Sequence, residues 1–249
     1  MPDHSPPLKD GKRRWIASLG EGLIRKLLPP VCVLCGATGC GALDICAGCL
    51  QDLPRNDHAC PLCATPSAPS QTRGAICPTC QRQPPPFTSS HVPFLYQDSI
   101  QSLVKGAKFQ GRLNMARLLG LCLARSVREG AIDHPEIIIP VPLHARRLRE
   151  RGYNQVLELG RPLSRELALP MAPHLCVRLR AITPQEKLSR EERRRNVRGA
   201  FGLAQPLAAR HLAILDDVVT TGSTATEIAL LLRQAGAQRI DLWAVARTP

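Results

Sequence analysis

The sequence contains few aromatic residues, with four Phe, two Trp and two Tyr among 249 residues. Proteins that bind single-stranded nucleic acid commonly stack bases on aromatic side chains, whereas here the aromatics are few and scattered. The scarcity therefore argues against sequence-specific base readout. It leaves non-specific binding of single-stranded DNA open, because a surface that follows phosphates needs only Lys and Arg.

Long apolar runs and an export signal are also absent. No stretch approaches the roughly 20 uninterrupted apolar residues of a membrane-spanning helix. The first residues, MPDHSPPLKDGKRRW, lack the order of basic, apolar and small residues that marks a secretory signal. The sequence therefore predicts a cytoplasmic protein with no stable membrane insertion. Its length allows one large domain or two smaller ones.

Cysteine, in contrast, is abundant, and eight of the eleven cysteines form four Cys-x-x-Cys pairs. The pairs are Cys32/Cys35, Cys46/Cys49, Cys60/Cys63 and Cys77/Cys80. Two such pairs complete a tetrahedral, closed zinc site, so the spacing predicts two structural Zn²⁺ sites. We expect sequential pairing, although a crossed pairing satisfies the same spacing. A redox-active thiol pair is the rival interpretation, but the strand–helix context of such motifs is missing.

The remaining cysteines and two histidines near the pairs are not needed as ligands. Cys40 is expected to be a bystander, and Cys122 and Cys176 lie in apolar runs typical of small core residues. Two complete all-cysteine sets leave no vacancy for His58 and His91, which we expect on the surface.

The formal charge is +13, which eight ligating thiolates and two Zn²⁺ would reduce to about +9. The excess is concentrated between residues 146 and 198, where 14 Lys and Arg face 6 Asp and Glu. That segment is expected to meet an anionic ligand.

Composition divides the chain into three parts: 1–30, a polar tail with an amphipathic helix; 31–86, a double zinc ribbon; and 87–249, an α/β domain. The helix expected over 13–27 would pack on the protein, or alternatively lie on a membrane surface. In the third part, the apolar patterns predict helices over 112–128, 154–167 and 224–235, and strands over 137–141, 176–179, 212–215 and 239–246. Strands that alternate with helices predict a mainly parallel sheet with helices on both faces.

The most informative stretch is LAILDDVVTTGSTATE, residues 212–227. Asp216 and Asp217 are expected at the carboxyl end of a buried strand, where open α/β sheets bind ligands. Thr220, Thr221, Gly222, Ser223 and Thr224 then offer hydroxyls and free backbone N–H groups at a helix start, which is a phosphate cradle. We expect the pattern Thr224-x-x-Glu227 to form a capping box.

No Gly-Lys-Ser/Thr follows, so the loop is not a P-loop, and hydroxyls beside one phosphate indicate a ribose 5-phosphate. The alternative is a plain capped helix with aspartates in surface ion pairs.

Two further segments supply cations. In IIIPVPLHARRLRERGYNQ a strand runs into a Pro-rich turn with His144, Arg146 and Arg147, suited to a pyrophosphate group. A solvated basic helix start is the alternative. Residues 180–201 form a long charged segment that we expect to act as a flexible lid, carrying Lys187 and Arg190 over the bound phosphates.

Residues 212–224 resemble the PRPP-binding motif of the type I phosphoribosyltransferases. The resemblance implies that Asp216 and Asp217 form the catalytic pair, holding the ribose 2- and 3-hydroxyls, while 220–224 hold the 5-phosphate. Purine-salvage members carry an aspartate at the position of Thr220, and its absence argues against a purine acceptor.

The stretches PVPLHARRLRERGYNQ, TPQEKLSREERRRNVRGAF and LDDVVTTGST, with the cysteine array before them, resemble the ComF/GntX family over most of the chain. The resemblance implies an N-terminal double zinc ribbon on a type I phosphoribosyltransferase fold, PRPP bound with Mg²⁺, and a link to competence, DNA uptake and recombination proteins.

From these features we expect Mg²⁺-dependent displacement of pyrophosphate at ribose C1 by an acceptor that residues 88–111 do not identify. Two alternatives stand beside this enzyme. One is a non-catalytic adaptor that senses PRPP or a nucleotide and binds single-stranded DNA. The other is a DNA-binding zinc protein with a vestigial pocket.

Overall fold

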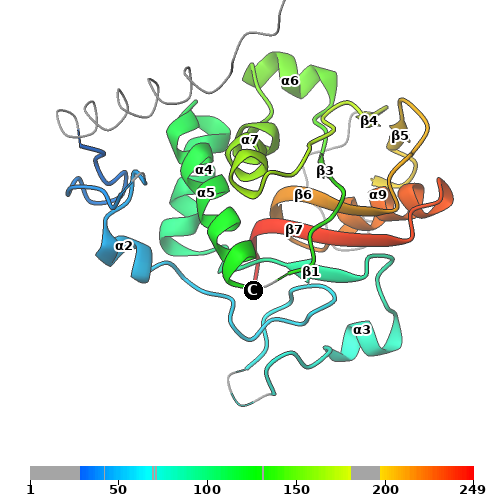
Figure 1. Ribbon diagram of the computed structural model, residues 1–249, viewed down its shortest axis with the longest axis horizontal. Helices are drawn as coiled ribbons and strands as arrows, with labels where there is room; N and C mark the ends of the chain where they lie inside the picture. The colour runs from blue at the N-terminus through cyan, green and yellow to red at the C-terminus, as the bar shows by residue number, and fades with distance from the viewer. Residues whose placement is uncertain (1–28, 42, 69, 71, 131, 181–196) are drawn as a thin grey trace, which may run out of the picture. The chain divides into compact units, whose positions relative to one another are not determined.

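The computed structural model describes residues 29–41, 43–68, 70, 72–130, 132–180 and 197–249 (Figure 1). Its internal contacts divide the chain into two compact units, residues 1–52 and 53–249. This division differs from the one expected from composition, because the second pair of Cys-x-x-Cys turns groups with the α/β part. The helix expected over 13–27 and most of the expected lid lie outside the described residues.

The described part of the first unit is small and contains one short helix, α2 (Ala47–Gln51). Its chain reverses through an isolated bridge between Val31 and Thr38, and only Ile45 and Cys32 supply deeply buried side chains. So little apolar burial cannot hold a fold of this size, which agrees with a structural metal.

The second unit is built on a parallel sheet with the order β1-β7-β6-β3, and β2 also pairs with β7. The strands are β1 (Ser89–His91), β2 (Phe94–Leu95), β3 (Ile137–Pro140), β6 (His211–Val219) and β7 (Arg239–Arg247). A separate antiparallel pair joins β4 (Cys176–Arg178) to β5 (Phe201–Leu203). The expected mainly parallel α/β architecture is confirmed.

Helices cover both faces of this sheet. The described helices of this unit are α3 (Pro78–Arg82), α4 (Asp98–Phe109), α5 (Leu113–Glu129), α6 (Ala145–Arg151), α7 (Gln155–Leu167) and α9 (Ser223–Gln234). Of these, α5, α7 and α9 pack directly on strands of the sheet. Figure 1 shows α4, α5 and α7 gathered together, with α9 apart from them across the sheet. The helices expected over 112–128, 154–167 and 224–235 are therefore confirmed within one residue at each end.

Alternation along β6 assigns its side chains to the two faces. Leu212 and Ile214 belong to the core cluster that contains Ile228 and Leu232 of α9. On the other face α7 approaches closely at Gly160, where an added Cβ would lie 2.9 Å from Leu215 Cδ2. The two sets of apolar residues explain why residues 212–215 of β6 are fully buried.

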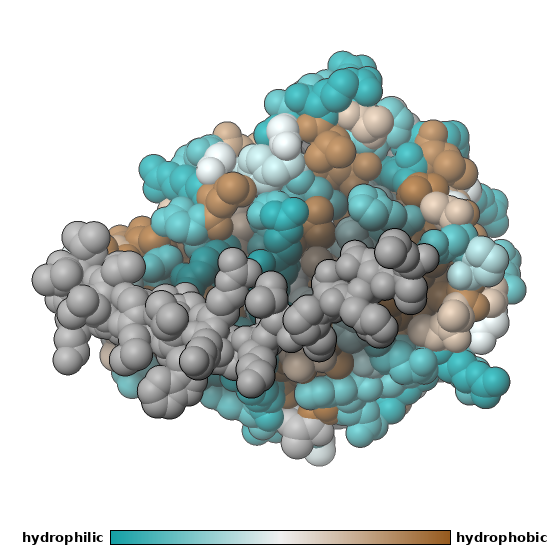
Figure 2. Space-filling model, turned by 45° about the horizontal axis from the view of Figure 1, so that its top comes forward, coloured by the Kyte–Doolittle hydropathy of each residue, from teal (hydrophilic) through white to brown (hydrophobic). Residues whose placement is uncertain are grey.

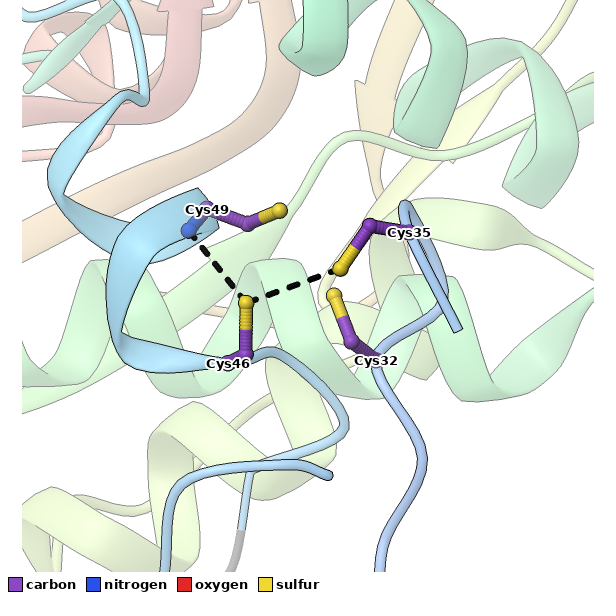
Figure 3. A group of neighbouring side chains, drawn as sticks. All are labelled: Cys32, Cys35, Cys46 and Cys49. Carbon is purple, nitrogen blue, oxygen red and sulfur yellow. Dashed lines mark hydrogen bonds between the residues drawn. The ribbon is translucent and has the colours of Figure 1, made fainter. Parts of the chain in front are cut away.

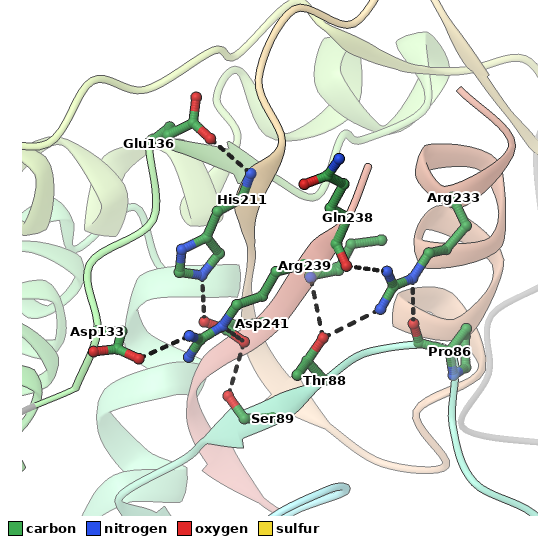
Figure 4. Close-up of polar contacts among 11 residues, drawn as sticks. Pro86, Thr88, Ser89, Asp133, Glu136, His211, Arg233, Gln238, Arg239 and Asp241 are labelled. Carbon is green, nitrogen blue, oxygen red and sulfur yellow. Dashed lines mark hydrogen bonds and ion pairs between the residues drawn. The ribbon is translucent and has the colours of Figure 1, made fainter. Parts of the chain in front are cut away.

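The amino-terminal ends of the strands are joined by a polar network (Figure 4). Asp241, fully buried, accepts a hydrogen bond from Ser89 Oγ at 2.8 Å and lies 2.7 Å from His211 Nε2. Arg233, near the end of α9, donates to Pro86 O and to Thr88 Oγ1, each at 3.2 Å. The network fastens β1 and the segment before it to the sheet, at the end opposite the carboxyl termini of the strands.

Cys122 and Cys176 are buried, as expected, and Cys40 is exposed. The expectation that His58 and His91 lie on the surface is wrong, because both are half-buried. His91 Nε2 lies 3.1 Å from Ser126 Oγ, and burial lowers the pKa of His91 to about 4.

Among the described residues, no helix combines the length and the apolar character needed to cross a membrane. On the face shown in Figure 2, hydrophobic residues lie scattered among hydrophilic ones outside the grey atoms.

Candidate functional site

The two aspartates lie where β6 outruns its neighbour β3. The last register pair between these strands joins Pro140 to Leu215, whereas β6 continues beside β7 as far as Val219. The expectation that the strand ends at Leu215 is therefore wrong: pairing with β7 carries it through Asp216 and Asp217. The aspartates still occupy the carboxyl edge of the sheet, in the space left open beyond β3.

Asp217 is buried, and both of its carboxylate oxygens contact protein groups. Its Oδ2 lies 2.9 Å from Lys108 Nζ of α4 and accepts a hydrogen bond from Gln155 Nε2 of α7 at 2.9 Å. Its Oδ1 accepts from the Val218 N–H at 2.7 Å. Burial lowers the pKa of Lys108, but the negative charges of Asp217 and Asp216 outweigh it and raise the pKa overall. Lys108 and Asp217 therefore form a charged pair.

Asp216 belongs to the opposite set of β6 residues, with Leu212 and Ile214. Its Oδ1 accepts a hydrogen bond from the Asp217 N–H at 2.9 Å. Burial, followed by the neighbouring charge of Asp217, raises the pKa of Asp216 to about 7. A hydroxyl donor or a cation beside this carboxyl would favour its ionised form, so Asp216 is the member of the pair that is poised to meet a ligand.

Residues 220–224 form a tight loop before α9. Gly222 adopts φ +75°, in the left-handed region that favours glycine, and it is the N-cap residue of α9. The hydroxyls of Thr221 and Ser223 lie 2.8 Å apart. The expected capping box is wrong, because α9 begins at Ser223 and Glu227 Oε2 instead accepts from the Gly199 N–H at 3.2 Å. Backbone N–H groups at the start of α9 thus remain suited to an anion.

A cavity of about 260 Å³ joins the aspartates to this loop. Besides Asp216 and Asp217, its wall includes Thr220, Gly222, Ser223 and Thr224. The same wall carries three cationic side chains, Lys108, Arg147 and Arg178. Burial lowers the pKa of Arg178, the nearby charge of Arg147 lowers it further, and Asp216 opposes both. The cavity therefore brings carboxylates, hydroxyls and several cations together, as a sugar phosphate would require.

The three basic residues expected to bind pyrophosphate are placed differently from one another. His144 is the N-cap of α6, where its Nδ1 accepts from the Arg146 N–H at 3.2 Å. The Arg146 side chain is 74% exposed and pairs with Glu150 at 2.8 Å, away from the residues that line the cavity. Arg147 is the one that lines it. The expected lid residues Lys187 and Arg190 lie outside the described residues.

Lys108, Gln155 and Arg178 were not identified from the sequence. Lys108 belongs to α4, a helix that was not predicted, and Gln155 to the first turn of α7. The preference of a buried carboxylate for a cation was the available signal, but it does not say which lysine of the chain supplies it.

The eight paired cysteines form two clusters, Cys32, Cys35, Cys46 and Cys49 in the first unit and Cys60, Cys63, Cys77 and Cys80 in the second. Sequential pairing is thus the arrangement in the structure. Figure 3 shows the four side chains of the first cluster turned toward one another from two separate turns.

The donor sets fit Zn²⁺. Within each cluster the ligand atoms all lie within 4.8 Å of one another. Cys35 Sγ lies 3.6 Å from Cys46 Sγ, and Cys63 Sγ lies 3.7 Å from Cys77 Sγ. A tetrahedral Zn–S₄ site has sulfur–sulfur separations of about 3.8 Å. Burial raises the pKa of Cys60, but backbone N–H groups, including that of Cys77, lower it more, to about 7. Burial raises the pKa of Cys63 and of Cys80 in the same cluster, so Cys60 is the thiol whose ionised form the protein itself favours.

Comparisons with known proteins agree with these features. Residues 23–81 match the model of a double zinc ribbon domain. The chain is 37% identical over 226 residues to DNA utilization protein YhgH of Escherichia coli O157:H7, covering 89% of this chain and 98% of that protein. It is 34% identical over 210 residues to competence protein F of Haemophilus influenzae, covering 82% and 90%.

Among solved structures, a purine phosphoribosyltransferase from Pyrococcus horikoshii is similar at 21% identity and a TM-score of 0.32, over 53% of this chain and 82% of that one.

Proposed function

Because the chain belongs to the family of competence protein F and DNA utilization protein YhgH, we propose that its cavity binds PRPP and supports phosphoribosyl transfer. One observation carries the proposal: Asp216, the 220–224 loop and the cations Lys108, Arg147 and Arg178 share one cavity. A ribose 5-phosphate with a diphosphate at C1 needs all three kinds of group.

Each group has a definite part in this proposal. The 220–224 loop anchors the 5-phosphate through N–H groups and hydroxyls. Asp216 accepts hydrogen bonds from the ribose hydroxyls, while Asp217 holds Lys108 in the cavity. Arg147 and Arg178 bind the diphosphate. His144 caps the helix that presents Arg147 and is a positioning residue.

The reaction in this proposal is a displacement at C1. The bond between C1 and the diphosphate oxygen breaks, its electron pair leaves with the diphosphate, and the acceptor forms the new bond to C1. Mg²⁺ bound with the diphosphate would help to neutralise the departing charge. Arg147, Arg178 and Lys108 lower the barrier by neutralising the same charge, and the anchored 5-phosphate fixes the orientation of C1.

Calorimetric titration of PRPP with Mg²⁺ into the zinc-replete protein tests the proposal. We expect micromolar binding that Asp216→Asn weakens by about tenfold, the loss of one strong hydrogen-bonding carboxylate. Pyrophosphate release during a screen of acceptors then tests turnover. If wild-type protein binds no PRPP, the pocket is vestigial. If it binds PRPP but no acceptor gives release, the protein is a sensor.

A second candidate function is that of a DNA adaptor. The relatives' names, which refer to DNA utilization and competence, and the formal charge of +13 favour it. In this role the cytoplasmic protein would bind single-stranded DNA and proteins of uptake or recombination. Anisotropy of a labelled oligonucleotide should show affinity that falls steeply with salt and is unchanged in Asp216→Asn. Loss of DNA binding in that variant would contradict a DNA surface separate from the cavity.

A further inference from the structure

Arg247, the last residue of β7, joins the phosphate loop to the second cysteine cluster. Its side chain is buried, with the residue 9% exposed. Nη1 donates to the carbonyl oxygens of Val219, at 3.0 Å, and Thr220. Nε donates to the carbonyl of Cys63 at 3.2 Å, and Nη2 to Thr65 Oγ1 at 3.1 Å. One planar guanidinium thus holds the loop on one side and a cluster turn on the other.

The strand register explains how Arg247 reaches the loop. β6 and β7 run parallel, and Val219 pairs directly with Arg247 where both strands end. Thr248, which follows Arg247, adds a second contact to the same residue: its N–H donates to Val219 O at 3.0 Å. The carbonyls that leave β6 and enter the loop are therefore fixed from β7.

Holding these carbonyls also orients the N–H groups of the loop. A peptide unit is planar and trans, so its N–H points opposite to its C=O. The Val219 carbonyl belongs to the same unit as the Thr220 N–H, and the Thr220 carbonyl to the same unit as the Thr221 N–H. Arg247 therefore sets the direction of two donors that an anion in the loop would use.

The other end of this bridge depends on the metal site. Cys63 is one of the four thiolate donors of the second cluster. Its turn is tightened by hydrogen bonds from the Ala64 N–H to Cys60 O at 2.8 Å and from the Cys60 N–H to Thr65 O at 2.9 Å. Asn56 Nδ2 and Ser90 Oγ also donate to this turn, at Ala64 O (3.0 Å) and Leu62 O (2.6 Å), and a metal bound by Cys60 and Cys63 would fix it further. Bound metal would therefore help to place the Cys63 carbonyl and the Thr65 hydroxyl.

A cavity of about 880 Å³ lies between the second cluster and the loop. The residues that line it include Cys63, Thr65, Thr221, Ser223 and Arg247. The hydrogen bonds from Arg247 fix the start of the loop from the β7 side, while the contact between the Thr221 and Ser223 hydroxyls and the first turn of α9 hold its other end.

We propose that the second cysteine cluster, through Arg247, holds the 220–224 loop in its anion-binding conformation, whereas the first cluster stabilises its own unit alone. Metal at 60/63/77/80 is thereby part of the phosphate site. The inference rests on the proposed binding of ribose 5-phosphate by this loop, and it makes Arg247 a positioning residue.

The decisive variant is Arg247→Lys, which keeps the charge and loses the planar fork. We expect two zinc ions per chain as in wild type, faster amide hydrogen exchange in the peptide spanning 216–226, and affinity for ribose 5-phosphate weaker by about tenfold or more. The matched control is Arg233→Lys, which removes a comparable set of hydrogen bonds, to two backbone carbonyls and one threonine hydroxyl, at the opposite end of the sheet. Arg233→Lys should lower the melting temperature by a similar amount and should change neither the exchange in 216–226 nor the affinity for ribose 5-phosphate.

A second arm compares the two metal sites in the full chain. Cys77→Ser should lower the zinc content by one ion, speed exchange in 216–226 and weaken ribose 5-phosphate binding. Cys46→Ser should lower the zinc content equally and leave exchange in 216–226 as in wild type. Equal effects of the two cysteine variants on this peptide, or an Arg247→Lys protein with wild-type exchange and affinity, would overturn the proposal.

The exchange measurement needs no ligand, so it separates the two claims. If wild type fails to bind ribose 5-phosphate but Arg247→Lys and Cys77→Ser still loosen the loop, the proposed function fails and the link between metal and loop stands. If wild type binds and neither variant alters the loop, the link fails and the proposed function stands.

Discussion

Lys108 Nζ lies 2.9 Å from Asp217 Oδ2, so a lysine of α4 and an aspartate of β6 form a largely buried ion pair at the carboxyl edge of the sheet. Their side chains are 22% and 6% exposed. The two adjacent aspartates therefore differ in role. Asp217 is bound by Lys108 and Gln155, whereas Asp216 has a raised pKa.

Removal of Lys108 should therefore harm stability as well as binding. In Lys108→Met the Asp217 carboxylate stays buried without its cation, which costs about 3 kcal/mol of unfolding free energy. Lys105→Met is the control, since Lys105 is exposed on the same helix. Urea unfolding measures both variants, and equal midpoints for the two would contradict a stabilising pair.

Whereas Lys108 stabilises the folded protein, the ionised Asp216 side chain should destabilise it. A folded-state pKa raised to about 7 means that the folded protein holds this proton longer than the unfolded chain, whose Asp pKa is about 3.9. Stability attributable to Asp216 is present below about pH 4 and is lost as the pH rises toward 7.

We therefore expect Asp216→Asn to raise the unfolding free energy at pH 8 by about 2 kcal/mol and to have little effect at pH 4. Denaturant unfolding across that range measures the change. Asp217→Asn, compared at pH 8, should instead destabilise the protein, because it leaves the Lys108 charge unpaired. Destabilisation by both substitutions at pH 8 would contradict the assignment.

Arg146 and Arg147 are adjacent but should differ in function. Arg147 lines the cavity, whereas Arg146 is exposed and pairs with Glu150. We expect Arg147→Gln to weaken diphosphate binding by about tenfold, the loss of one charge-assisted contact, and Arg146→Gln to leave it within about twofold. Titration calorimetry with diphosphate and Mg²⁺ distinguishes the two.

Arg178 provides an independent test of the same wall. Arg178→Gln should weaken diphosphate binding as Arg147→Gln does, while Arg180→Gln, on an exposed residue two positions later, serves as its control. Ribose 5-phosphate, which lacks the diphosphate, should bind all four variants like wild type. If only Arg146→Gln and Arg180→Gln weakened diphosphate binding, Arg147 and Arg178 would not be the residues that bind the diphosphate.

Gly222 should be difficult to replace for conformational rather than steric reasons. An added Cβ would come no closer than 4.0 Å to Val219 Cγ1, yet the residue has φ +75°. Gly222→Ala is expected to cost about 1 kcal/mol and to weaken ribose 5-phosphate binding, since relief of the strain distorts the loop. Gly74→Ala, also at positive φ, should show the stability loss without the binding loss.

The sequence by itself determined the chemistry of local segments. Four Cys-x-x-Cys turns predict two zinc sites, because ligand spacing in a tight turn fixes where two sulfurs point. The apolar run from Leu212 and the loop with Gly222 predict a buried strand followed by an anion-binding turn, because these features depend on neighbours only a few residues away.

Only the tertiary structure decided how distant segments meet. The length of β6 depends on its register with β7, 20 or more residues later in the chain, so the run to Leu215 alone misplaced the strand end. Lys108 reaches Asp217 across 109 positions, and Arg247 reaches Cys63 across 184 and Thr220 across 27. Such partners are selected by the packing of helices and strands, and no local pattern around Lys108 or Arg247 records which carboxylate or carbonyl will face them.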